Sequence, residues 1–316
     1  MSDTDAPSPA KPWWRRWRYL PLLLAGAWWL SPWPGPASIE SFFSRGWFRW
    51  VTGLTASLHD LVPVSLSSIL LVIALLGLPW LWWRGLRRRI RARAPARALL
   101  GWGLDRIATG IGIVALLFLL LWGAGYRRTR LETRLGIDGP PTSTDSLPEL
   151  LRHTLTVLEN TIDAPRDADR ALASITENIA QCTPSIDSVP IAIPHRVKRL
   201  PAGSLLAFGV TGIMSPWLVE PHIDGALPAA ARVATGAHEL AHAAGYCGEA
   251  DADVASYLAG MRATDGFARY AIALRMYLGL VGELPRSQQL DAIQRLPIAA
   301  LQDRALERKT IQEHRI

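Results

Sequence analysis

The sequence predicts a mainly helical α+β protein, in which three N-terminal transmembrane helices precede a water-facing domain. Three observations support this. Apolar residues make up 49% of the 316 residues and cluster in the first 126. The segments after residue 126 have ordinary composition and helical spacing, interrupted by short β-prone pieces. A motif of two histidines and a glutamate lies in one of those later segments.

Three apolar runs predict the membrane domain, residues 1–126. They cover about 17–33, 64–83 and 107–126. The second and third contain no charged residue and are long enough to cross about 30 Å of hydrocarbon. The first is shorter, has a basic start and small residues at its end, and so is also compatible with a signal peptide cleaved after Ala27. Thirteen of the 14 tryptophans lie at or before Trp122, which is typical of aromatic residues at membrane interfaces.

Arginines predict the orientation of these spans. The first 126 residues hold 14 basic and 5 acidic side chains, whereas the remainder holds 20 basic and 22 acidic ones. In the connection between the second and third spans, the stretch from Arg84 to Arg97 contains seven arginines and no acidic residue. Basic segments stay in the cytoplasm, so we expect a multi-pass protein of the bacterial inner membrane with a cytoplasmic N-terminus. The lipid bilayer is therefore an expected partner, and nucleic acid is not.

Residues 127–316 form the predicted extracytoplasmic domain. A linker-like stretch at 136–146 precedes two segments with helical spacing, SLPELLRHTLTVLENTI and DADRALASITENIAQC. VPIAI and SLLAFGVTGI, between about Val189 and Val219, predict a small sheet. Four further helices are expected at about 228–245, 249–262, 265–281 and 286–308.

The motif HELAH predicts a metal centre. His238 and His242 are four residues apart, so on a helix their imidazoles face one point. Two neutral imidazoles at this spacing bind Zn²⁺ in zincins, and the glutamate between them, Glu239, is the general base. Gly245 follows at a position where the helix must end if the chain is to return to the metal. Glu249, seven residues after His242, is then the candidate third ligand.

Several further residues have candidate roles near this centre. Asp253 is one turn beyond Glu249 and is expected to accept a hydrogen bond from a ligand histidine, whereas Asp251 is expected to be solvated. GVTGIMSPWLVE is the candidate edge strand for substrate, with Met214 and Trp217 in a pocket or in the core. The candidates for stabilising an oxyanion, left open, are Tyr246, Tyr257 and Tyr270. His195 and His222 are expected to have surface or structural roles.

Only two cysteines occur, Cys182 and Cys247, which excludes a cluster built from cysteines alone. Both lie in the half placed outside the cytoplasm, where oxidation is permitted, so we expect a disulfide between them. The alternative for Cys247 is an inhibitory thiolate ligand to the metal.

Longer segments resemble a known family. SFFSRGWFRWVTGLTASLHDLVPVSLSSIL and GVTGIMSPWLVEPHIDGALP are similar to segments of a bacterial membrane family described only as a domain of unknown function (thirty-eight ten). LLLWGAGYRRTRLETRLGI resembles its W-G-x-N-Y-x-R motif, with Gly125 in place of the usual Asn. AHELAHAAGYCGEADADVASYLA resembles its H-E-L-A-H-x-x-G-x-x-x-E core, with Asp251 for Glu and Asp253 for Asn.

The resemblance implies three spans and an outward zincin-like domain, with His238, His242 and Glu249 as ligands and Glu239 as acid/base. We therefore expect a zinc metallopeptidase acting on a peptide or protein. Two alternatives stay open, an inactive envelope binding or scaffold protein and an amidase acting on cell-wall peptide.

Overall fold

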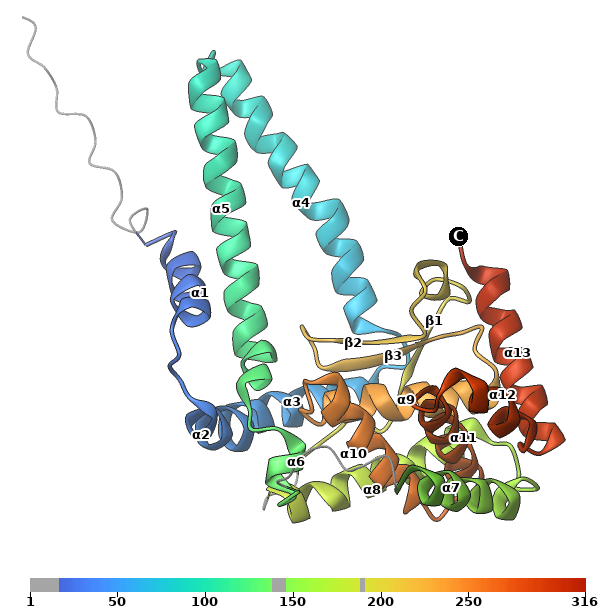
Figure 1. Cartoon of the computed structure of the whole chain (residues 1–316). Helices are drawn as coiled ribbons and strands as arrows, with labels where there is room; N and C mark the ends of the chain where they lie inside the picture. Colours follow the sequence, from blue (N-terminus) through green and yellow to red (C-terminus); the bar gives the residue numbers. More distant parts are fainter. Residues whose placement is uncertain (1–16, 138–145, 188–190) are drawn as a thin grey trace, which may run out of the picture. The chain divides into compact units, whose positions relative to one another are not determined.

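The computed structural model describes residues 17–137, 146–187 and 191–316, with the side chains of 182–187 outside the description. The described chain is mainly helical with a three-stranded sheet, which confirms the predicted α+β class (Figure 1). Contacts divide it into two units, residues 1–35 with 73–120, and residues 36–72 with 121–316. Residues 36–72 thus group with the C-terminal part, whereas the sequence prediction placed them before a boundary at residue 126.

Two helices in the described residues, α4 (Leu66–Arg91) and α5 (Ala96–Leu121), are long and apolar enough to cross a membrane. They correspond to the predicted spans at 64–83 and 107–126. α5 ends earlier than predicted, because the glycines of Gly123–Arg127 lie in a 3-10 turn, η3. α1 (Leu20–Leu30) is apolar, but its 11 residues extend only about 17 Å.

The second unit is built around helix α9 (Ala229–Ala243). It contacts the sheet on one side and α8 (Ala168–Asp187), α10 (Glu249–Met261) and α11 (Gly266–Gly282) around its remaining surface (Figure 1). Other helices pack around this group, namely α2 (Pro36–Ser38), η2 (Ile39–Trp47), α3 (Phe48–Leu61), α6 (Leu131–Arg134), α7 (Leu147–Thr161), η5 (Leu206–Phe208), α12 (Arg286–Gln294) and α13 (Ile298–His314).

The sheet has the order β1-β3-β2 and lies over α9. β3 (Glu220–Asp224) is completely buried, pairs parallel with β1 (Lys198–Leu200) and pairs antiparallel with β2 (Gly212–Ser215). β2 is therefore an edge strand, as GVTGIMSPWLVE was predicted to be.

Three predictions about secondary structure were wrong. Residues 191–193 of VPIAI are not in a strand, because Pro190 and Pro194 flank the segment and cannot donate to a ladder. Only the end of SLLAFGVTGI is a strand, β2. The helix expected at 286–308 is two helices, since Pro297 caps the start of α13.

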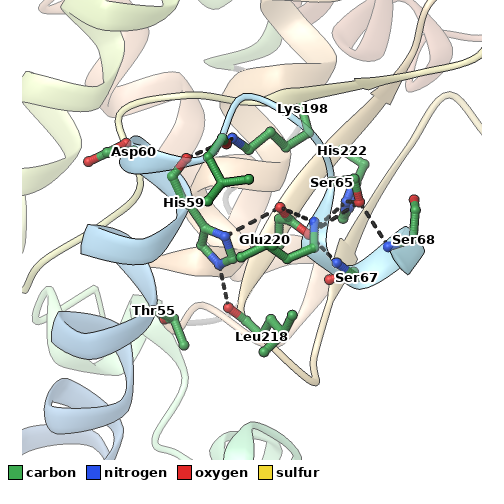
Figure 2. A network of polar contacts seen from close by, with 12 residues as sticks. Thr55, His59, Asp60, Ser65, Ser67, Ser68, Lys198, Leu218, Glu220 and His222 are labelled. Carbon is green, nitrogen blue, oxygen red and sulfur yellow. Dashed lines mark hydrogen bonds and ion pairs between the residues drawn. The ribbon is translucent and has the colours of Figure 1, made fainter. Parts of the chain in front are cut away.

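A buried carboxylate, Glu220 on β3, joins the sheet to the start of α4. It accepts hydrogen bonds from the amides of Leu66 and Ser67, at 3.2 and 2.7 Å, in the first turn of that helix (Figure 2). The rings of His59 and His222 lie 3.3 and 3.2 Å from its oxygens. Burial opposes its charge, but these donors outweigh burial and hold the pKa of Glu220 far below its usual range.

Lys198 on β1 extends this network to the end of α3. Its ammonium donates to the carbonyls of His59 (2.7 Å) and Val62 (Figure 2). Carbonyls at the end of a helix have no N–H donor within the helix, so Lys198 satisfies them. The ring of His59 donates from Nε2 to the carbonyl of Leu218 at 2.6 Å. The turn between α3 and α4 is thereby held to two strands through buried polar contacts.

Asp224, at the end of β3, organises the chain that follows β1. Its buried carboxylate accepts from the backbone amides of Gly203, Leu205, Leu206 and Ala226, at 2.8 to 3.1 Å. Burial opposes the charge, but four N–H donors outweigh it and lower the pKa of Asp224.

We expect Glu220→Gln to destabilise the protein by about 3 kcal/mol or more. The side-chain NH₂ of glutamine is a hydrogen-bond donor, and it would face the backbone amides of Leu66 and Ser67, which also donate. Denaturant titration of the full chain in detergent measures the change. Glu313→Gln is the matched control, since Glu313 is 57% exposed and should change stability by no more than about 0.5 kcal/mol. Equal unfolding midpoints for Glu220→Gln and the wild type would contradict the role assigned to this carboxylate.

The lowered pKa of Asp224 also predicts a pH dependence. Its stabilising contribution is fully present above the unfolded-state pKa of about 3.9 and is lost as the pH falls toward the folded-state value. Unfolding free energy should therefore decrease on acidification below about pH 4. Asp224→Asn should be less stable at pH 7 and should show a shallower decrease in acid. An identical acid dependence in both proteins would exclude Asp224 as its source.

Candidate metal centre

Helix α9 brings the two histidines of HELAH together as predicted. Alanines and Gly236 let this helix pack closely, since a Cβ at Gly236 would lie 2.7 Å from the Leu172 side chain of α8. His238 and His242 lie one turn apart with ring centroids 4.6 Å apart. His242 is buried and His238 is partly exposed.

The predicted glycine bend follows α9. Gly245 has a φ of +91°, a left-handed conformation that glycine adopts without strain, and α9 ends at Ala243. A Cβ there would also lie 2.8 Å from the ring of Phe48 on α3. The bend reverses the chain so that Glu249 opens α10 beside the histidines.

Glu249 points at both imidazoles. Its carboxylate oxygens lie 3.1 Å from Nε2 of His238 and 3.7 Å from Nε2 of His242. Ligand atoms around a tetrahedral zinc, with bonds of about 2.0–2.1 Å, are about 3.4 Å apart. The three side chains therefore fit such an ion, and their ligand atoms all lie within 4.8 Å of one another.

The other ring nitrogens are held by acceptors. Nδ1 of His238 donates to Asp253 at 2.8 Å, and Nδ1 of His242 donates to the carbonyl of Tyr246 at 2.8 Å. A proton on each Nδ1 leaves the Nε2 lone pairs directed at Glu249, where a cation would sit. This arrangement brings Asp253 to the position predicted for it.

The electrostatics of the two histidines differ. Burial lowers the pKa of His242, and the neighbouring His238 lowers it further. Burial also opposes the charge of His238, but the hydrogen bond to Asp253 and the nearby carboxylates outweigh it and raise its pKa. The same hydrogen bond lowers the pKa of Asp253.

Glu239 lies on the buried side of the pair, 5% exposed. Burial raises its pKa to about 7, while the His238 ring and the Met214 backbone favour its charged form. Edge strand β2 passes directly over it at Gly212, where a Cβ would lie 2.8 Å from Oε1 of Glu239. The carboxylate is thus enclosed between α9 and β2.

A cavity of about 520 Å³ contains the site. Its lining includes both histidines, Glu239, Glu249 and Asp253, together with residues Gly209–Met214 of the β2 region. Four lining residues were missed by the sequence analysis, namely Trp122, Tyr126, Thr235 and Arg275. Trp122 and Tyr126 belong to the turn after α5, and Arg275 belongs to α11. Only the W-G-x-N-Y-x-R resemblance drew attention to that turn.

Trp122 packs edge-on against His242, with ring centroids 5.9 Å apart, and against Tyr126 at 5.0 Å. Burial raises the pKa of Tyr126, and the nearby Glu249 carboxylate adds to the effect. In the described part of the chain, the cavity lining includes none of the three tyrosines proposed from sequence, Tyr246, Tyr257 and Tyr270.

The structure shows where the other residues singled out from the sequence lie. Met214 is buried and also lines the cavity, whereas Trp217 is not among its lining residues. His222 has the structural role described for the Glu220 network. His195 is a surface residue paired with Asp60 at 2.7 Å.

Asp251 was wrongly expected to be solvated. Its carboxylate accepts from the amide of Leu131 at 3.1 Å, at the start of α6, and lies 3.9 Å from Arg134. It therefore stabilises the N-terminus of α6.

Cys247 is buried, and its sulfur lies 3.7 Å from the carbonyl oxygen of Trp122. Burial raises its pKa well above the usual range. The side chain of Cys182 lies outside the described residues, so the disulfide between the two stays a prediction.

Comparisons with known proteins give one match. A family model described as a protein of unknown function (DUF3810) matches residues 43–315. No curated protein and no solved structure matches the chain.

We expect Gly212→Ala to destabilise the protein by about 1–3 kcal/mol, because the new Cβ would lie 2.9 Å from the backbone oxygen of His222. Thermal unfolding in detergent measures the loss. Gly53→Ala is the control, since Gly53 lies within α3 with nothing within 4 Å of a Cβ, and should be neutral or stabilising. Equal melting of Gly212→Ala and wild type would show that the strand tolerates a side chain here.

Proposed function

This chain belongs to the DUF3810 family, and we propose that it is a membrane-anchored, zinc-dependent metallopeptidase. The observation that carries the proposal is the convergence of His238, His242 and Glu249, with each histidine held through its Nδ1. A carboxylate suited to proton transfer, Glu239, lies beside them. This combination is typical of zincin-type hydrolases.

The residues of the site have complementary roles in this proposal. His238, His242 and Glu249 hold the ion, which when bound supplies a water of lowered pKa and polarises the substrate carbonyl. Glu239 accepts the proton of the attacking water and delivers it to the leaving amine. Tyr126 and Arg275 line the cavity and offer donors for the developing negative charge on the carbonyl oxygen.

The edge strand supports a peptide as the substrate class. β2 has β3 on one side only, and residues 209–214 of the same region line the cavity. An extended peptide pairing with the outer edge of β2 would lie across the opening of the site. The side chain of Ile213 is 48% exposed on this strand and would contact such a peptide.

Membrane anchoring is proposed with the orientation deduced from sequence. α4 and α5 are two spans, and the segment containing α1 is proposed as a third. The arginines at the end of α4 and the start of α5, from Arg84 to Arg97, favour a cytoplasmic location for this region, so we propose that the metal centre faces the outside of the inner membrane.

We expect Glu239→Gln to keep zinc and to lose peptide hydrolysis by at least about 100-fold, because the amide cannot accept the proton. Zinc content and cleavage of a fluorogenic peptide library are measured on the full chain in detergent. His238→Ala should lose both, and His195→Ala, on the surface, should lose neither. Hydrolysis that persists in Glu239→Gln would rule out the mechanism. Bound zinc without hydrolysis in wild type would favour a binding protein.

Asp253→Ala should weaken zinc affinity about 10- to 100-fold, because Nδ1 of His238 then loses its acceptor. Asp253→Asn should restore most of the affinity, since its amide oxygen still accepts from Nδ1. Competition with a fluorescent chelator measures both. If Asp253→Ala binds zinc as tightly as wild type, the aspartate does not orient the ligand.

A further inference from the structure

An apolar stripe lies on the continuous helical segment formed by η2 and α3, residues 39–61. Trp50, Leu54, Leu58 and Leu61 are 43% to 79% exposed and follow one another at intervals of four, four and three residues. This spacing puts them on one face of a helix. Phe42, 79% exposed, extends the apolar surface onto η2, and Trp47 stacks on Trp50 at 5.2 Å.

The opposite face of the same segment is anchored in the protein. Phe48 lies against the Gly245 bend, Phe43 lies beside Gly125, and His59 contacts Glu220 (Figure 2). Phe48 and His59 are 2% and 1% exposed. The stripe is therefore fixed outward by packing on its other side, and cannot be buried by a rotation of the helix.

Chain continuity indicates what covers the stripe. α3 ends at Leu61, and α4, long and apolar enough to span a membrane, begins at Leu66. The intervening turn is held by the Glu220 network, so α3 stays within a few residues of the point where the chain enters hydrocarbon. Tryptophan and leucine at such a point are the residues that favour the bilayer interface.

We propose that η2 and α3 form an interfacial helix that lies on the bilayer with Trp50, Leu54, Leu58 and Leu61 in the headgroup–acyl boundary. The partner is the lipid surface itself. Glu40 pairs with Arg45 and Arg128, and the ring of His195 lies 2.7 Å from Asp60, so these charged side chains have partners within the protein. Apolar burial rather than charge drives this contact, and neutral lipid suffices.

Site-directed spin labelling of the full chain tests the proposal. Leu54→Cys is labelled in a Cys182→Ser background, with Cys247 retained because it is buried, and the protein is reconstituted in vesicles of neutral phosphatidylcholine. Leu306→Cys on α13 is the matched control, at 49% exposure against 54% for Leu54. We expect oxygen to collide with the label at Leu54 more often than a water-soluble nickel chelate, and the reverse at Leu306.

Two results would overturn the proposal. A label at Leu54 as accessible to the nickel chelate as the label at Leu306 would show that water covers the stripe. A label at Leu54 protected from both reagents would show that protein covers it, as in a contact between two copies of this chain. Either result leaves the hydrolase proposal standing, because the Glu239→Gln comparison tests that independently.

Discussion

One buried charge, the carboxylate of Glu220, constrains much of the second unit. A carboxylate removed from water must be matched by donors, and here they come from β3, from α3 and from the first turn of α4. Each partner is fixed because leaving the charge unmatched would cost several kcal/mol. The sheet, the turn before α4 and the end of α3 are therefore rigidly connected. Lys198 connects β1 to the same group through its hydrogen bond to the carbonyl of His59.

The same sheet encloses the candidate metal centre. β3 carries Glu220 and His222, while its neighbour β2 crosses Glu239 at Gly212. α9 packs on both strands and presents its two histidines at the cavity. The positions of the two ligand histidines thus depend on their hydrogen bonds to Asp253 and Tyr246. They also depend on the sheet, which the Glu220 network connects to α3 and α4.

Sequence predicted the local features of the site and missed the distant ones. Helical periodicity and a left-handed glycine are local, so the histidine pair, the bend at Gly245 and the direction of Glu249 could be deduced. Trp122 and Arg275 reach the cavity although each lies more than thirty residues from HELAH in the sequence, and no spacing rule encodes such contacts. Residues 36–72 were placed in the membrane domain because they adjoin the apolar runs, although α3 within them buries every third or fourth residue against the rest of the second unit.

The origin of the residues that line the cavity limits which fragments of the protein would keep the site intact. Trp122 and Tyr126 follow directly from the end of α5, while His59 and Ser65 precede α4 and Ser67 lies in its first turn. A fragment starting after residue 126 would lack part of the wall and would remove the donors that α3 and α4 provide to Glu220, leaving His222 beside this buried carboxylate. Expression of an isolated C-terminal fragment is thus a poor route to this protein, and purification should begin with the intact chain.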